Sequence, residues 1–186
     1  MSTSAIVKEA EERMRKAVES TRTELAKIRT GKASPAILDA VRVNYYGSPV
    51  PLKQVATVNA PEAKLITVQP WEKNLLQEIE KAIQKADLGL NPQNDGTVIR
   101  LPIPPLTQER RQDLVKTCKR VGEEGRVAVR NVRRDAMEHL KKAKKDGELA
   151  EDDEKTFEKD LQKITDKEIG QVDELLKHKE AEVMEV

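Results

Sequence analysis

The strongest constraint on the fold is a long helical pattern in the second half of the chain. Apolar side chains between residues 107 and 145 recur at steps of three and four, the spacing that gathers side chains on one face of an α-helix. This stripe consists of Leu114, Cys118, Val121, Gly125, Val129, Val132, Ala136, Leu140 and Ala143. Its steps follow an eleven-residue repeat more closely than a heptad, which predicts one long, nearly straight helix with a buried face.

A basic edge runs along the same helix. Arg126, Arg130, Arg133 and Arg134 recur at helical steps, and the first three are turned roughly 120° from the apolar stripe. Guanidinium groups at this spacing can bind successive phosphates with paired hydrogen bonds, although the same spacing also suits a structural ion-pair face or an acidic protein partner. The spacing alone therefore favours nucleic-acid contact without excluding the other two.

The charge distribution supports a polyanion-binding side. The formal net charge is only +1, but residues 106–145 carry 13 Lys and Arg against 6 Asp and Glu, and residues 146–186 carry 6 against 15. Aromatic residues make up 2% of the chain and charged residues 36%, a balance that favours long, charge-rich helices with an aliphatic core. The acidic last segment could also neutralise its basic neighbour within one bundle.

Two further helices and an interrupting segment complete the pattern. Helical seams run from about Ser4 to Arg29 and from Glu151 to about Val183. Between the first and second helices the period changes to strand spacing, with a helix expected at 72–86. We therefore predict an α+β fold, an elongated three-helix bundle (1–30 and 106–186) with a small mixed α/β domain (31–105) inserted between helices 1 and 2.

The insertion has two connections, which predict a two-stranded hinge. Thr30 and Gly31 form the entry, where glycine permits a left-handed exit from the helix. Pro102, Pro104 and Pro105 make the exit extended and stiff. The small domain could swivel about these two segments.

Catalysis finds little support. The chain contains no glycine-rich phosphate loop, no H-E-x-x-H and no G-x-S-x-G motif. The acidic run Glu151–Glu154 is typical of a helix N-terminus. We expect the single cysteine, Cys118, to lie in the core, and His139 and His178 to lie on solvated helix faces. No stretch approaches a membrane span. We expect a cytoplasmic, monomeric protein that is not an enzyme and binds no metal and no cofactor.

Several motifs in order resemble the bacterial ribosome recycling factor family nearly end to end. They are KIRTGKASP (27–35), YYG (45–47), DLGLNP (87–92), IRLPIPPLT (99–107) followed by Arg110 and Arg111, and RVAVRNVRRDA (126–136). The family's architecture, a three-helix bundle with an inserted domain and a tRNA-like shape, agrees with the organisation predicted above.

The resemblance implies a function in translation. A recycling factor binds the large ribosomal subunit after termination and, with elongation factor G and GTP, splits the subunits. The family's ribosomal RNA contact maps onto Arg110, Arg130 and Arg133, with Arg29 near the hinge, and the small domain meets elongation factor G. Lys32 stands where the family more often carries arginine, so charge is kept and a forked phosphate contact is lost.

One alternative stays open from the residues alone. A helical interaction or adaptor protein that uses the acidic third helix, without binding ribosomes, would show similar seams and a similar charge segregation. Cosedimentation with ribosomes separates the two hypotheses.

Overall fold

The computed structural model describes residues 3–185, which divide into two compact units. One unit combines the residues up to Arg29 with those from Gln108 onwards, and the other is Thr30–Thr107. The boundaries expected from the sequence, after residues 30 and 105, lie within two residues of these divisions. The chain thus leaves the first unit after one helix and returns to it for the other two.

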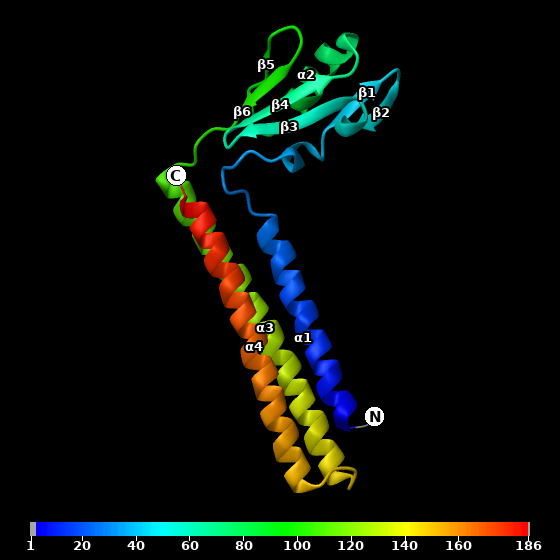
Figure 1. Ribbon diagram of the computed structural model, residues 1–186, viewed down its shortest axis with the longest axis vertical. Coiled ribbons are helices and arrows are strands. Elements are labelled where there is room, and N and C mark those ends of the chain that lie inside the picture. Colours follow the sequence, from blue (N-terminus) through cyan, green and yellow to red (C-terminus); the bar gives the residue numbers. More distant parts are fainter. Residues whose placement is uncertain (1–2, 186) are drawn as a thin grey trace. The chain divides into compact units, whose positions relative to one another are not determined.

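The first unit is a bundle of three long helices, each packed against the other two (Figure 1). They are α1 (Thr3–Ala26), α3 (Gln108–Lys145) and α4 (Glu151–Met184). Both α3 and α4 begin and end within a residue or two of the expected positions. Helix α1 ends three residues earlier than expected, and the left-handed Gly31 (φ 80°) lies in the following loop.

The bundle core confirms the apolar stripe of α3. All nine predicted stripe residues are buried, and Gly122 joins them. The spacing in the first helix predicts an inward seam of Ile6, Ala10, Met14, Ala17, Thr21, Leu25 and Ile28. All but Ala17 and Ile28 are buried, and Val18 is more deeply buried than Ala17. The aliphatic character of this core follows from helices that approach too closely for many aromatic rings.

The spacing in the third helix predicts an apolar inward face of Phe157, Leu161, Ile164, Val172, Leu175, Leu176 and Val183, but three buried positions of α4 are polar. Glu154, Thr165 and Glu168 share the stripe with Leu161 and Val172. The Glu154 carboxylate accepts a 2.7 Å ion pair from Lys144, so it is more than a helix-terminal acid, and the Thr165 hydroxyl donates to the Leu161 carbonyl at 2.7 Å. Oε2 of the third residue, Glu168, is buried and has no hydrogen-bond partner among residues 3–185. A search for apolar spacing along α4 misses all three positions because their side chains are polar.

Two glycines of α3 allow the neighbouring helices to approach its backbone. A Cβ at Gly125 would overlap the Thr21 side chain of α1, and a Cβ at Gly122 would lie 2.8 Å from Leu176 of α4. Because no other residue lacks a Cβ, these two positions fix where α1 and α4 pack along α3.

The second unit contains a hairpin, a four-stranded antiparallel sheet and one helix (Figure 1). The hairpin pairs β1 (Arg42–Tyr45) with β2 (Ser48–Pro51), and the sheet has the order β3-β4-β6-β5. The sheet strands and the helix are β3 (Ala56–Glu62), β4 (Leu65–Pro70), β5 (Gln93–Asn94), β6 (Ile99–Pro102) and α2 (Leu76–Lys85). Short 3-10 turns span Pro35–Leu38, Leu52–Gln54 and Lys73–Leu75.

Two details of this unit correct the sequence prediction. The turn-rich composition of residues 88–96 predicts a loop, but Gln93 and Asn94 form the short edge strand β5. Pro102, assigned to the hinge, instead ends strand β6 opposite Leu65, and the next residue, Ile103, donates its N–H to the Lys64 carbonyl at 2.8 Å. The sheet therefore extends into the proline-rich segment, because pairing with β4 continues to its end.

The hairpin turn explains the YYG motif. Tyr46 and Gly47 both have positive φ angles (47° and 89°), as the tightest hairpin turns require. The hydroxyls of Tyr45 and Tyr46 both donate to Glu72, at 3.3 and 3.2 Å, which ties the hairpin to the segment after β4. The nearby Glu72 charge raises the pKa of Tyr45 above its ordinary value.

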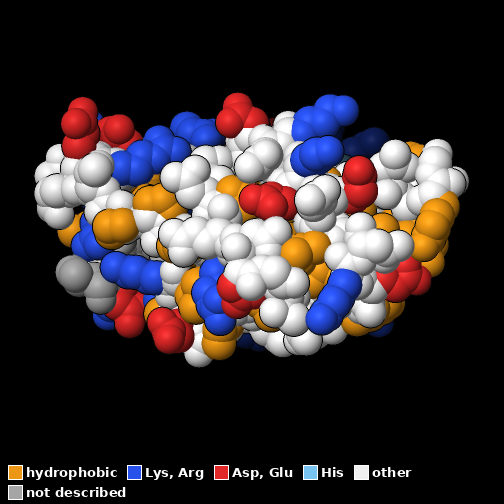
Figure 2. Space-filling view, turned by 90° about the horizontal axis from the view of Figure 1, so that it is seen from above, with side chains coloured by type: hydrophobic (Ala, Val, Ile, Leu, Met, Phe, Trp, Pro, Cys, Tyr) orange, Lys and Arg blue, Asp and Glu red, His pale blue; other side chains and the backbone are white. Residues whose placement is uncertain are grey.

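Little apolar surface is left exposed. Among the described residues, the exposed large hydrophobic side chains are Tyr46, Trp71, Val127 and Met184. On the face shown in Figure 2, hydrophobic side chains are interrupted by basic and acidic ones of both signs. Such a mixed surface gives no extended apolar patch on this face.

The close approach at Gly125 generates a stability prediction. Gly125→Ala should lower the free energy of unfolding by about 1–3 kcal/mol, since the new methyl group overpacks against Thr21. Gly170→Ala, on an open face of α4, should raise it by about 0.5–1 kcal/mol because alanine favours the helix. Urea unfolding followed by circular dichroism measures both free energies. Equal effects of the two substitutions would refute the packing argument. Adding Thr21→Ala to Gly125→Ala should partly restore stability, because it removes the side-chain atoms that the new methyl group overlaps.

Candidate nucleic-acid interface

A basic hollow lies on one side of α3. Its lining side chains recur at three- and four-residue steps, so the helix itself brings them to one face, where they border an open depression of about 530 Å³. The lining residues are Val127, Arg130, Asn131, Arg133, Arg134, Met137 and Lys141. Four cationic groups and no acidic group line it, which makes it a site suited to an anion. We call it the α3 hollow.

Arg133 is half-buried, and its guanidinium group lacks a partner within the described residues. Its Nε is buried and has no hydrogen-bond partner among residues 3–185, and no described residue forms an ion pair with it. Arg134, by contrast, donates to the Asn131 amide oxygen at 3.2 Å. A buried guanidinium nitrogen without a partner is costly, and a bound phosphate oxygen would satisfy it.

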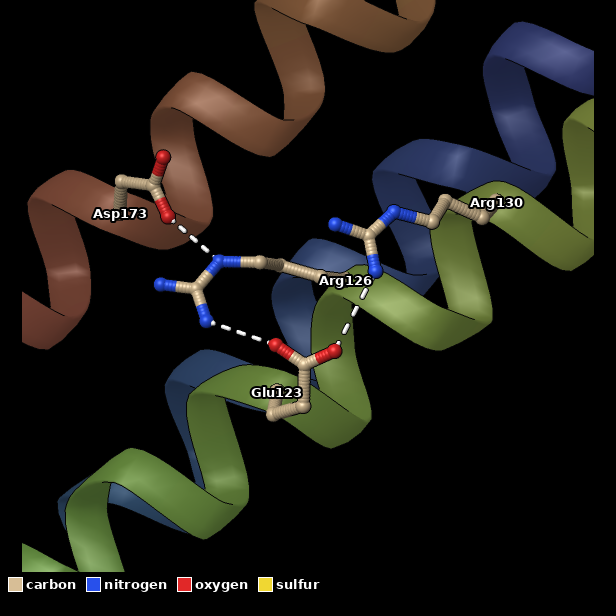
Figure 3. A network of polar contacts seen from close by, with 4 residues as sticks. All are labelled: Glu123, Arg126, Arg130 and Asp173. Atoms are coloured by element: carbon tan, nitrogen blue, oxygen red, sulfur yellow. Dashed lines mark hydrogen bonds and ion pairs between the residues drawn. The ribbon is translucent and has the colours of Figure 1, made fainter.

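Arg126 lies between two carboxylates, Asp173 of α4 and Glu123 of its own helix (Figure 3). Its Nε donates to Asp173 of α4 at 2.7 Å, and its Nη1 donates to Glu123 at 3.1 Å. Its side chain is only 21% exposed, and the hydrogen bond to Asp173 raises the pKa of Arg126 above its ordinary value. We infer that Arg126, expected at the RNA contact, instead joins α3 to α4.

Among the described residues, Arg130 is intermediate between the unpaired Arg133 and the doubly paired Arg126. It borders the α3 hollow, its side chain is 55% exposed, and its Nη1 donates to the other oxygen of Glu123 at 3.2 Å (Figure 3). A pair this exposed to water is weak, so Arg130 remains available to another anion.

The other predicted contact residues are not part of the hollow. Arg110 is exposed in the first turn of α3, roughly 30 Å along the helix axis from Arg130 at 1.5 Å per residue. Arg29 is exposed after the end of α1, and Lys32 is exposed in the second unit. The structure therefore groups only Arg130, Arg133 and Arg134 of the predicted set.

Lys141 is a lining residue that the sequence analysis did not assign to the site. Its place beside Lys142, Lys144 and Lys145 near the end of the helix predicts a role at the helix C-terminus instead. Its distance from Arg134, seven residues or two helical turns, is the signal that could have placed it on the same face.

The structure supplies no sign of other chemistry. Within residues 3–185, no group of three or more His, Cys, Asp or Glu side chains is placed to hold a metal ion. Cys118 is buried, and desolvation raises the pKa of its thiol above the ordinary value. None of the described helices combines the length and apolar character that a membrane crossing requires.

Comparison with known proteins identifies the family to which the chain belongs. Residues 21–184 match the family described as ribosome recycling factor. The chain belongs to the ribosome recycling factor family. The ribosome-recycling factor of Exiguobacterium sibiricum is 58% identical over 182 residues, which cover 98% of each chain. That of Myxococcus xanthus is 56% identical over 181 residues, covering 97% of this chain and 98% of the relative.

Solved structures agree with the family assignment. A solution structure of the ribosome recycling factor matches with a TM-score of 0.73 and 45% identity, covering 99% of this chain and 98% of the other. A second structure, of the T. thermophilus factor, has a TM-score of 0.62, 47% identity and full coverage of both chains. In it, the factor and E. coli elongation factor G are bound to the E. coli post-termination complex. The α+β fold and the family resemblance are confirmed, and the adaptor hypothesis gains no support.

The contrast between Arg126 and Arg134 generates a prediction. Arg126→Met should lower the free energy of unfolding by about 1 kcal/mol, because two carboxylates lose their shared cation. Arg134→Met should change it by less than about 0.5 kcal/mol, since within the described part of the chain Arg134 donates its hydrogen bond to the nearby Asn131. Urea unfolding of both variants measures the difference; equal values would show that Arg126 does not join the helices.

Proposed function

We propose that this protein recycles ribosomes. It binds the post-termination ribosome on the large subunit and, with elongation factor G and GTP, promotes separation of the subunits. The proposal is supported by the similarity to recycling factors over 98% of the chain and by a relative bound with elongation factor G to the post-termination complex. This site of action would place the protein in the cytoplasm.

The α3 hollow is the proposed contact with large-subunit ribosomal RNA. Arg133 is the central group, because its buried Nε lacks a partner, and Arg130, Arg134 and Lys141 surround it with positive charge. Phosphate oxygens suit guanidinium donors in this arrangement. Arg110, Arg29 and Lys32 would serve as separate contacts nearer the connections between the two units.

The protein would supply binding and mechanical coupling rather than catalysis. The hydrolysis of GTP belongs to elongation factor G, so no nucleotide site is needed in this chain. The bundle would act as the anchored part, and the α/β unit would receive the push of its partner. A monomer is sufficient for this mechanism.

The two connections between the units are the proposed hinge. Gly31 has a positive φ, and a Cβ there would lie 3.0 Å from the Leu106 side chain, so the entry and exit segments pack against each other. Thr30, Gly31, Pro104 and Pro105 form this hinge, with Pro102 belonging to the sheet beside it. Prolines keep the exit extended and stiff, which suits transmission of a force.

Removal of the central arginine tests the RNA contact. Arg133→Ala should weaken binding to purified large ribosomal subunits about tenfold and make the plot of log affinity against log salt shallower by about one unit, since one phosphate contact is lost. Arg120→Ala is the matched control, because Arg120 lies on the same helix outside the hollow and pairs with Glu124 at 2.9 Å. Equal affinities and slopes for both variants would remove the hollow from the RNA contact.

A shortened exit segment tests the hinge. Deletion of Pro105 should leave affinity for large subunits unchanged and slow subunit splitting with elongation factor G and GTP, measured by light scattering, since the connection between the units is altered. Pro92→Gly, inside the α/β unit, is the control and should split ribosomes normally. Normal splitting by the deletion variant would show that this segment transmits no force.

A further inference from the structure

The carboxylate of Glu123 is shared between two arginines of α3. Its Oε1 accepts from Arg130 Nη1 at 3.2 Å, and its Oε2 accepts from Arg126 Nη1 at 3.1 Å (Figure 3). Glu123 therefore links the arginine that joins α3 to α4 with the arginine that borders the α3 hollow. The proposed RNA contact does not itself explain this acidic group at its edge.

The two arginines depend on Glu123 to different extents. Arg126 is mostly buried and keeps a shorter 2.7 Å contact with Asp173, so it stays in place without Glu123. Arg130 is 55% exposed, and among residues 3–185 Glu123 is the one acidic group with which it forms an ion pair. Loss of the Glu123 charge would thus release Arg130 while leaving Arg126 held.

The direction of the Arg130 side chain matters for binding. Glu123 lies two helical turns before Arg130, whereas Arg133, Arg134 and Lys141 all follow it along α3. The ion pair therefore draws the Arg130 guanidinium toward the N-terminal end of the hollow, away from the other cations. Because Nη1 of Arg130 is bonded to Glu123, a phosphate placed among all four cations would compete with that carboxylate for this group.

We propose that Glu123 is a positioning residue that competes with RNA phosphate for Arg130, so that ribosome binding exchanges one carboxylate for one phosphate. This inference rests on the proposed function of the α3 hollow. In the free protein the pair holds Arg130 in one orientation and neutralises its charge. On the ribosome, phosphate replaces Glu123, which becomes solvated.

The exchange is energetically accessible. Both side chains of the pair are 55% exposed, and ion pairs this exposed to water are weak. An RNA phosphodiester carries the same single negative charge as the carboxylate, but in the hollow it would meet three further cations, Arg133, Arg134 and Lys141. Glu123 would therefore moderate affinity without blocking binding, which suits a factor that must leave after each round.

Neutralisation of Glu123 tests the proposal. Glu123→Gln should bind purified large ribosomal subunits about two- to fivefold more tightly at low salt, the range expected for loss of a competing exposed pair. The plot of log affinity against log salt should become steeper by less than about one unit. In the wild type the released Glu123 attracts a cation on binding, whereas the neutral glutamine does not. A purely structural role for Glu123 would not change this slope.

Two further variants isolate the Arg130 contact. Asp173→Asn removes the other acidic partner of Arg126 and should lower bundle stability with little change in the salt slope. Glu123→Gln in an Arg130→Ala background should have no effect on affinity, because its proposed competitor is absent. An effect of equal size in that background would overturn the proposal.

The outcomes also separate this inference from the proposed function. Unchanged or weaker binding by Glu123→Gln, together with weakened binding by Arg133→Ala, would refute the exchange and leave the RNA contact standing. Unchanged binding by both variants would refute the hollow as the contact and the exchange with it.

Discussion

The structure depends on the close approach of α1 and α4 to the backbone of α3. Gly122 and Gly125 leave no side chain on α3 at the points where Leu176 and Thr21 pack. Because helices pack at fixed positions only when their surfaces interlock, these contacts set the rotation of α3 within the bundle. That rotation turns Arg133 and Lys141 outward and Arg126 toward Asp173. A packing constraint therefore decides which arginines are available to a ligand.

Electrostatics then separates the arginines of one helix by the acids around them. Arg126 has two carboxylate partners on two sides, Arg130 has a share of one, and Arg133 has none among the described residues. The positive charge that is not paired with a carboxylate therefore increases from Arg126 to Arg133 along the helix. The acidic composition of α4 neutralises α3 at selected positions, such as Asp173 against Arg126 and Glu154 against Lys144, and leaves the hollow basic.

The sequence predicted the fold well where a single periodic signal decides the structure. The α3 stripe, the three helices and the inserted unit follow from spacing, because burial of an apolar face dominates helix packing. The availability of Arg126 could not be predicted, since it depends on Asp173, which is distant in sequence. Strand β5 and the polar core residue Glu168 were missed for a similar reason, because pairing with β6 and packing within the bundle, not local composition, determine them.

The discontinuity of the bundle has a consequence for folding during synthesis. Residues 30–107 contain all the strands of the α/β unit, so this unit can complete its own core as soon as it leaves the ribosome. Helix α1 is made earlier, yet its buried face has no partner until α3 and α4 follow. During synthesis the apolar face of α1 therefore stays exposed to solvent while the α/β unit folds. The many charged side chains on the other face of α1 would keep this helix soluble until α3 and α4 have been made.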